Sequence, residues 1–366
     1  MRIVFAGTPD YAVPSLKALA ALAPAHEVVA VVTQPDRAKG RSATPTPPPV
    51  KAAALALGIK PERIIQRSIN KPEALEFLRG LAPDLLCVVA YGGLLKKDAL
   101  ELAKLFPLNA HGSILPQHRG AAPIQAALLA GDAQTGVCIM KMEAGLDTGP
   151  VLLERAIPIL PTDTAGTLHD KLAELSAACF VEALKLPDLA GATFTPQDHA
   201  HATYAGKLSK DTGRVDWSKD AVFLERFVRA MSPWPGAWTS IALPDGKNSK
   251  RLRIAKAALP PGTPRAASLT RVISLADVQK MQSTAGQAAA DSATESRAAE
   301  LAPPAAVRVV SVANAPREDG AARFEVECGQ GALQLLRVQA EGGREMSVDE
   351  FLRGQGRLYA NGARVE

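Results

Sequence analysis

The sequence predicts an α/β protein with a parallel-rich sheet in its N-terminal part and a smaller β-barrel in its C-terminal part. Three observations carry this prediction. Short apolar runs alternate with amphipathic runs as far as Leu184, which is the rhythm of a parallel sheet covered by helices. After Asp216 the helical period gives way to short alternating segments. The 366 residues, 47% of them hydrophobic, exceed what one typical domain needs.

The N-terminal elements follow one another in a regular order. Strands are expected at residues 2–6, 27–33, 84–90, 108–111, 136–142 and 151–159. Helices are expected at residues 15–22, 50–57, 72–81, 123–130 and 165–184. The last helix spaces Leu168, Leu172, Leu175 and Cys179 three or four residues apart, so one of its faces should be buried.

The C-terminal elements begin after a polar segment. Residues 191–214 lack a sustained period, which predicts a linker over the surface between a first domain at 1–190 and a second at 215–366. In the strand that follows, Arg251 and Arg253 share one face while Leu252 and Ile254 share the other. Ala-, Ser- and Thr-rich residues 260–304 predict a mobile insertion, with a helix near 273–281. A strand at 332–338 and a capped helix at 347–353 close the chain.

Composition excludes several classes of protein. The longest apolar run, residues 85–95, is too short to span a bilayer, and the N-terminus lacks the features of a secretory signal. The four cysteines form no C-x-x-C pair, so we expect reduced core residues rather than a zinc site. These features predict a cytoplasmic protein without a membrane partner or a metal.

Positive charge is concentrated in one part of the chain. The formal charge is +5 and the isoelectric point is about 9.0. Basic residues outnumber acidic ones by thirteen to five between Lys207 and Arg271. A polyanionic partner for the second domain would fit this distribution.

Candidate catalytic residues follow the predicted strands. The turn after the first strand, residues 7–14, reads GTPDYAVP and lacks G-x-G-x-x-G, which disfavours a dinucleotide cofactor. Asn109 and His111 lie two apart where a strand ends, so their side chains should converge on one face. Asp147 lies in a glycine-flanked loop from which it can reach the same crevice.

An amide, an imidazole and a carboxylate suit acyl transfer to an amine. That reaction needs a stabilised oxyanion, a proton taken from the attacking nitrogen and a proton returned to the leaving nitrogen. By themselves, however, such residues are far more often two turn residues and a satisfied buried histidine than a catalytic set.

Longer stretches around these residues carry a family resemblance. They comprise residues 109–116 (NAHGSILP), 119–125 (RGAAPIQ), 145–149 (GLDTG), 5–10 (FAGTPD), 33–37 (TQPDR), 49–51 (PVK), 90–92 (AYG), 203–205 (TYA), 234–238 (WPGAW) and 350–354 (EFLRG). Together they resemble the folate-dependent formyltransferases, and within that family the members that formylate methionyl-tRNA. Ala110, Gly112, His118 and Pro150 depart from the usual family residues without removing a candidate catalytic group.

The resemblance implies a fold, a reaction and a folate site. It implies a Rossmann-like formyltransferase domain over 1–190 and an OB-like, tRNA-binding domain over 215–366. The catalytic set would be Asn109, His111 and Asp147, with 10-formyltetrahydrofolate as co-substrate. Asn109 and His111 would stabilise the oxyanion, and Asp147 would orient His111. The folate site would comprise Ser113, Ile114, Leu115, Pro116, Tyr91 and Gly92.

The resemblance also implies that the acceptor end of methionyl-initiator-tRNA is bound. The expected contacts are Arg37, Lys39 and Arg41 in one loop, and Lys207, Lys247, Lys250, Arg251 and Arg253 in the second domain. The loop also fits as an ordinary surface loop, and the charge run also fits as a solvated face. We expect Trp234 and Trp238 to belong to the barrel core, and the chain to work as a monomer.

Two other functions remain open at this point. Another folate-dependent formyltransferase, acting on a small ribonucleotide or sugar amine, would carry similar catalytic residues, although the basic second domain argues against it. An RNA-binding protein that had lost catalysis would be expected to lose the amide, imidazole and carboxylate. All three are intact here.

Overall fold

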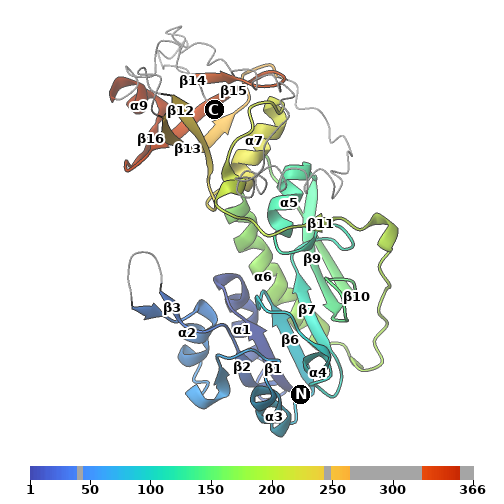
Figure 1. Cartoon of the computed structure of the whole chain (residues 1–366). Helices are drawn as coiled ribbons and strands as arrows, with labels where there is room; N and C mark the ends of the chain where they lie inside the picture. The colour runs from blue at the N-terminus through green and yellow to red at the C-terminus, as the bar shows by residue number, and fades with distance from the viewer. Residues whose placement is uncertain (39–43, 243–248, 264–323, 355–366) are drawn as a thin grey trace, which may run out of the picture. The chain divides into compact units, whose positions relative to one another are not determined.

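The computed structural model describes residues 1–38, 44–242, 249–263 and 324–354. By contacts the chain divides into two compact units (Figure 1). The N-terminal unit comprises residues 1–124, 134–159 and 167–206. The C-terminal unit comprises residues 125–133, 160–166 and 207–366. Two short segments of the N-terminal half of the sequence therefore cluster with the C-terminal unit.

A seven-stranded sheet organises the N-terminal unit, in the order β10-β9-β7-β6-β1-β2-β5. Its strands are β1 (Arg2–Gly7), β2 (Glu27–Val32), β5 (Ile64–Ile65), β6 (Leu85–Val89), β7 (Pro107–His111), β9 (Gln134–Lys141) and β10 (Val151–Pro158). The five strands from β7 to β5 in this order pair in parallel. β9 runs antiparallel to β7, and β10 runs antiparallel to β9. The predicted parallel-rich sheet is thus confirmed.

Burial explains why the central strands read as unbroken apolar runs. Every residue of β6 is buried, and so is every residue of β7, as expected for strands covered on both faces. One core cluster joins Val4 of β1 and Val88 of β6 to Leu75 and Leu78 of the helix after β5. The polar Asn109 and His111 interrupt this pattern at the end of β7.

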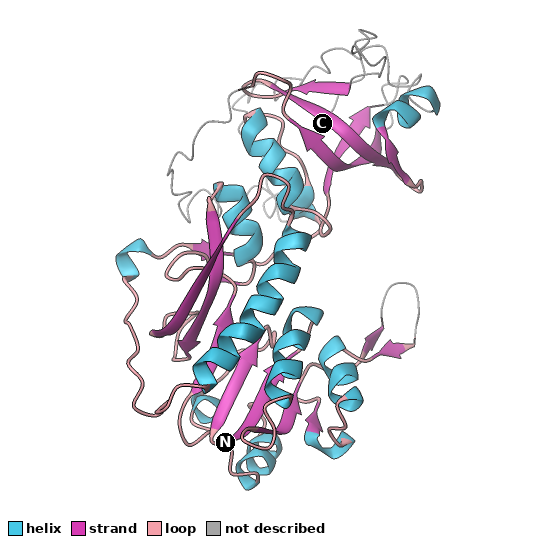
Figure 2. Ribbon diagram, turned by 180° about the vertical axis from the view of Figure 1, so that it is seen from behind, coloured by secondary structure: helices cyan, strands magenta, loops and turns pink. Residues whose placement is uncertain are grey.

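Helices cover the sheet. They are α1 (Val13–Ala20), α2 (Pro49–Ala56), α3 (Pro72–Gly80), α4 (Lys97–Leu100) and α6 (Ala165–Leu184), whereas most of α5 (Pro123–Ala130) clusters with the C-terminal unit. α6 runs along the sheet beside α1 (Figure 2). The buried Tyr11 hydroxyl contacts Ser176 Oγ of α6 at 3.1 Å. Leu168 and Leu172 of α6 are fully buried, which confirms the predicted apolar face.

The C-terminal unit contains an antiparallel, half-barrel sheet in the order β12-β13-β15-β14, with β16 beside β15. Its elements are α7 (Ala221–Ala230), β12 (Ala237–Ala242), β13 (Ser249–Ala258), β14 (Phe324–Glu327), β15 (Ala332–Ala340), β16 (Glu345–Ser347) and α9 (Val348–Gly354). In β13, Leu252 and Ile254 are buried and Arg251 is exposed, as the alternation predicts. The predicted insertion at 260–304 lies outside the described residues except for 260–263.

Two expectations about large side chains are wrong. Trp234 is 52% exposed, not part of the core. Trp238 is half-buried, with the Arg251 guanidinium 3.7 Å from its ring centroid.

Among the cysteines, Cys87, Cys138 and Cys179 are buried as expected, but Cys328 is only half-buried. Over the residues that the structure describes, none of the helices combines the length and apolar character needed to cross a bilayer.

Candidate active site

Two of the candidate catalytic residues, Asn109 and His111, lie at the carboxyl end of β7. Asn109 pairs with Met140 of β9, and His111 pairs with Cys138, so the two side chains share one face of the sheet. Asn109 is 9% exposed and His111 is 5% exposed. Within the described part of the chain, the Asn109 amide makes no side-chain hydrogen bond. Asn109 and His111 are therefore two buried polar side chains on one face of β7.

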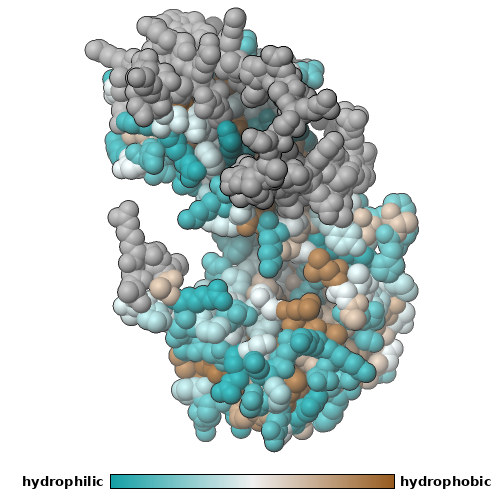
Figure 3. Space-filling model, viewed as in Figure 1, coloured by the Kyte–Doolittle hydropathy of each residue, from teal (hydrophilic) through white to brown (hydrophobic). Residues whose placement is uncertain are grey.

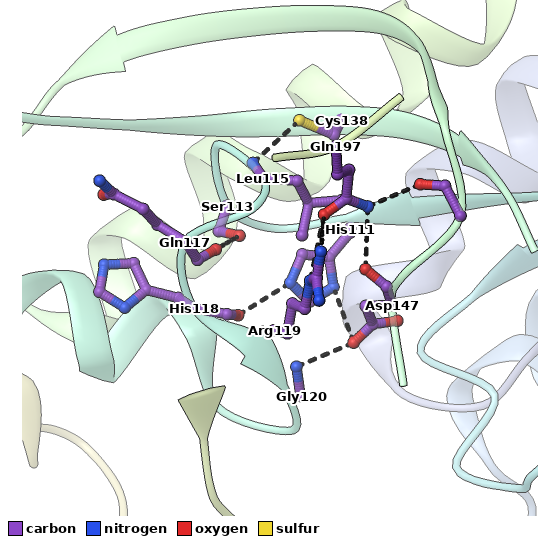
Figure 4. A network of polar contacts seen from close by, with 11 residues as sticks. His111, Ser113, Leu115, Gln117, His118, Arg119, Gly120, Cys138, Asp147 and Gln197 are labelled. Atoms are coloured by element: carbon purple, nitrogen blue, oxygen red, sulfur yellow. Dashed lines mark hydrogen bonds and ion pairs between the residues drawn. The ribbon is translucent and has the colours of Figure 1, made fainter. Parts of the chain in front are cut away.

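The His111 ring is fixed from two sides (Figure 4). Its Nε2 lies 2.9 Å from the carbonyl oxygen of His118. Because a carbonyl oxygen only accepts, Nε2 carries a proton. Its Nδ1 faces Asp147 Oδ2 at 3.6 Å, longer than a hydrogen bond. The predicted convergence of Asp147 on His111 is thus present.

The Asp147 carboxylate is held in an unusual backbone conformation. Asp147 has φ +52°, a left-handed conformation that costs about 1–3 kcal/mol in a non-glycine residue. The same Oδ2 accepts a hydrogen bond from the Gly120 amide at 2.8 Å. The strained loop therefore brings one carboxylate oxygen to both the imidazole and a backbone donor.

The loop after β7 is braced by its own polar groups. Ser113 Oγ donates to the Gln117 carbonyl at 2.6 Å, and the Leu115 amide donates to Cys138 Sγ at 3.3 Å. Burial raises the pKa of the Cys138 thiol to about 12, so this sulfur stays protonated and is a poor nucleophile. Ser113 and Leu115 thus shape the loop that presents the His118 carbonyl to His111.

The second part of the expected folate site lies in the loop after β6. The Tyr91 ring is buried in the core, where its hydroxyl accepts a hydrogen bond from the Ile69 amide at 3.2 Å. Burial raises the pKa of this phenol, and the Ile69 bond offsets part of the rise. Gly92 is exposed with φ +78°. A ligand at this loop would meet its backbone rather than the Tyr91 ring.

A cavity of about 810 Å³ lies between the start of β7 and residues 141–145 at the end of β9, and neither His111 nor Asp147 lines it. Its walls include Leu95, Phe106, Met142 and Gly145, with Lys141 among the polar groups. Ligand pockets typically have this volume and this mixture of apolar walls and a few polar groups. Figure 3 shows apolar atoms gathered where Figure 1 draws β7 and β9. None of the expected folate residues is among the residues that line the cavity.

Two buried residues of this site were not predicted from the sequence. Arg119 is 1% exposed and Gln197 is 8% exposed, and their side chains bond each other beside Asp147. Arg119 belongs to a stretch that carries the family resemblance, but nothing there indicated its role. Gln197 lies in the segment predicted to be a surface linker, and no sequence period marks it as buried. The linker prediction is wrong at this residue.

The expected tRNA contacts that the structure describes are distributed over both units. Arg37 is exposed on β3 (Arg37–Ala38), which pairs with β4 (Pro45–Thr46). Lys207, Lys250 and Arg251 are exposed. Arg253 is half-buried and donates to the Pro233 carbonyl at 2.9 Å. The others in the set, Lys39, Arg41 and Lys247, lie outside the described residues.

Comparison with known proteins assigns the chain to a family. The formyl transferase family model matches residues 1–184, and the formyl transferase C-terminal domain model matches residues 207–292 and 313–356. A methionyl-tRNA formyltransferase of Neisseria meningitidis serogroup C is 40% identical over 97% of this chain and 97% of its own. One from Stenotrophomonas maltophilia is 42% identical over 96% of this chain and 97% of its own.

A solved structure shares the fold at low sequence identity. HypX from Aquifex aeolicus, in complex with tetrahydrofolic acid, superposes with a TM-score of 0.53 and 16% identity. The match covers 97% of this chain and 48% of that protein. Both family models and the full-length relatives agree on one assignment. The chain therefore belongs to the formyltransferase family, and within it to the methionyl-tRNA formyltransferases.

Proposed function

We propose that this protein transfers the formyl group of 10-formyltetrahydrofolate to the amino group of methionyl-initiator-tRNA. The observation that carries the proposal is the approach of Asp147 to His111 at the end of β7, with Asn109 two residues before His111 on the same face of the strand. The relatives that match nearly the whole chain are methionyl-tRNA formyltransferases, which supports this acceptor.

The reaction requires one bond to form and one to break at the formyl carbon. The acceptor amine attacks this carbon, its oxygen becomes an oxyanion, and the carbon–nitrogen bond to the folate then breaks. One proton leaves the attacking nitrogen, and one reaches the folate nitrogen. The products are the formylated amine and tetrahydrofolate, so no oxidant or reductant is needed.

The side chains divide this work according to their partners. The Asn109 amide, which bonds no described side chain or backbone group, donates directly to the oxyanion. The Nε2 of His111 already donates to the His118 carbonyl. His111 therefore stabilises the oxyanion through the positive charge of its doubly protonated ring. Asp147 faces the other ring nitrogen, where it orients the imidazole and assists the proton transfer.

Substitution of the three residues tests these roles. We expect Asn109→Ala, His111→Ala and Asp147→Asn each to lower kcat for methionyl-tRNA formylation on the order of 100-fold or more. His26→Ala, which removes a histidine from the turn before β2, is the matched control and should keep wild-type activity. Wild-type kcat in folded His111→Ala would contradict the catalytic assignment.

The basic residues are proposed to bind tRNA phosphates. Lys207, Lys250 and Arg251 present exposed cations, and the stack on Trp238 restrains the Arg251 guanidinium. Arg37, Lys39, Arg41, Lys247 and Arg253 complete the set. Lysine and arginine contacts to phosphates position a nucleic acid through its backbone.

Several further statements stay predictions. We propose that residues 1–190 carry catalysis, 191–214 connect the domains and 215–366 bind tRNA. Ser113 to Pro116, with Tyr91 and Gly92, remain the proposed folate contacts. We also propose that the enzyme acts in the cytoplasm as a monomer, without a metal or a membrane partner.

A further inference from the structure

A buried glutamine joins the segment between the two family matches to the candidate active site. Gln197 lies after the N-terminal match, which ends at residue 184, and before the C-terminal match, which starts at residue 207. Its side chain is 8% exposed, whereas its neighbours Pro196 and Asp198 are exposed. The Gln197 side chain therefore turns inward between two exposed neighbours.

All the hydrogen-bonding capacity of the Gln197 amide is used. Its Nε2 donates to the Asp147 carbonyl at 2.9 Å and to the Gly149 carbonyl at 2.6 Å. Its Oε1 accepts from Arg119 Nε at 3.1 Å and Nη2 at 2.7 Å. An amide has two N–H donors and two lone pairs on its oxygen. The glutamine is therefore fully satisfied by the loop on one side and by Arg119 on the other (Figure 4).

Arg119 determines which way the amide faces. A guanidinium only donates, so the oxygen of Gln197 must face Arg119 and its NH₂ group must face the two carbonyls. Arg119 is itself 1% exposed, and its Nη2 also lies 3.1 Å from His199 Nδ1. The backbone amides of Arg119 and Ala121 donate to the carbonyls of Thr203 and Ala205. Arg119 and Gln197 are thus held in place by the hydrogen bonds of Arg119 to His199 and of the 119–121 backbone to Thr203 and Ala205.

The carbonyls that Gln197 binds belong to the catalytic loop. Asp147 has a left-handed backbone, which persists only when its surroundings hold it. The bond to its carbonyl fixes the peptide plane on one side of the residue, and the Gly120 amide fixes the carboxylate on the other. We propose that Gln197, oriented by Arg119, is a positioning residue that sets the Asp147 carboxylate against His111. This inference rests on the proposed function only for its activity readout.

The variant Gln197→Glu keeps the hydrogen bonds with Arg119 and removes those to the Asp147 and Gly149 carbonyls. The glutamate keeps oxygens for Arg119 and gives that buried cation a carboxylate partner, so the fold should survive. It has no donor for the Asp147 and Gly149 carbonyls. We expect kcat for formylation to fall on the order of 100-fold, the effect of a misplacement of about 1 Å. KM for methionyl-tRNA and the folate donor should stay near wild type.

The pH profile of kcat and a crystal structure show whether the loss runs through Asp147. In Gln197→Glu the pH profile of kcat should shift, because the Asp147 carboxylate no longer faces the His111 imidazole. A purely structural defect would lower the active fraction and leave the profile unchanged. Independently of activity, the variant crystal structure should show Asp147 out of its left-handed conformation and Oδ2 farther than 3.6 Å from His111 Nδ1.

Two further variants complete the test. Thr195→Val changes an exposed side chain of the same segment, whose backbone alone pairs with Val151, and should behave as wild type. If Gln197→Glu does not fold, the double variant Arg119→Met/Gln197→Met removes both polar partners without leaving a buried charge unpaired. It should show the same loss of kcat and the same shift of the pH profile.

The outcomes separate this inference from the proposed function. Wild-type protein that fails to formylate methionyl-tRNA would contradict the proposed function, and the crystal structure of Gln197→Glu would still decide the inference. A folded variant with wild-type kcat and pH profile, or with Asp147 unmoved, would overturn the inference alone.

Discussion

Gly120 has a position that no other residue can take without strain. Its φ is +113°, and a Cβ added there would lie 2.5 Å from the Ala205 carbonyl oxygen. Its amide is also the backbone donor to Asp147 Oδ2. A side chain here would push the 118–121 loop away from the 203–205 segment and move that donor. Both stability and the placement of Asp147 therefore depend on this glycine.

Gly120→Ala should lower the free energy of unfolding by about 1–3 kcal/mol, the cost of a residue held in a disfavoured backbone region. The kcat for formylation should fall with it. Urea unfolding and the formylation assay measure the two effects. Gly80→Ala, at the end of α3 where an added Cβ meets no atom within 4 Å, should be neutral or stabilising. Equal unfolding free energies for the two variants would contradict this account of Gly120.

The sequence allowed some of these side chains to be predicted and hid others. Asn109 and His111 lie two apart at a strand end, so their convergence follows from strand geometry. Gln197 and Arg119 meet across 78 residues of sequence, and such a contact depends on how the loops fold back. No local hydrophobic period in the sequence indicates the contact between Gln197 and Arg119. Trp234 was misassigned because an aromatic residue among prolines looks like core, although it is exposed in the structure.

Short polar motifs fix the ends of several elements. Ser347 and Glu350 form a capping box at the start of α9. The Ser347 hydroxyl accepts from the Glu350 amide at 3.2 Å, and a Glu350 carboxylate oxygen accepts from the Ser347 amide at 2.9 Å. Two donors that the helix leaves unpaired are thereby satisfied. The predicted capped helix at 347–353 is confirmed.

Ser347→Ala should destabilise the protein by about 1 kcal/mol, the usual cost of losing such a cap. Ser347→Thr retains the hydroxyl and should restore most of that stability. Urea unfolding of both variants, followed by fluorescence, gives the comparison. The role of the cap would be refuted by Ala and Thr variants of equal stability.

The longer helices and strands were predictable from the sequence. The relative directions of neighbouring strands were harder to predict. An apolar run predicts a strand, but it does not say whether β9 runs with or against β7, and the structure makes this pair antiparallel. Two-residue strands such as β3 and β8 (Arg119–Gly120) are too short to show a period. β8 matters for the site, because its pairing with β11 (Tyr204–Ala205) fixes the loop that carries Gly120.

The chain as a whole assigns different tasks to its two units. The N-terminal unit contains the amide, imidazole and carboxylate together with the cavity. The C-terminal unit presents exposed cations along β13. The charge bias between Lys207 and Arg271 was visible in the sequence. The membership of residues 125–133 and 160–166 in the C-terminal unit was not, because it depends on tertiary contacts alone.

Acceptor choice tests the central claim most directly. The purified chain would be mixed with 10-formyltetrahydrofolate and either methionyl-initiator-tRNA, a ribonucleotide amine or an amino sugar nucleotide, and each product identified by mass spectrometry. Formylation of methionyl-tRNA, and neither small amine, is the predicted result. Formylation of a small amine, with methionyl-tRNA left unmodified by the same active preparation, would contradict the account.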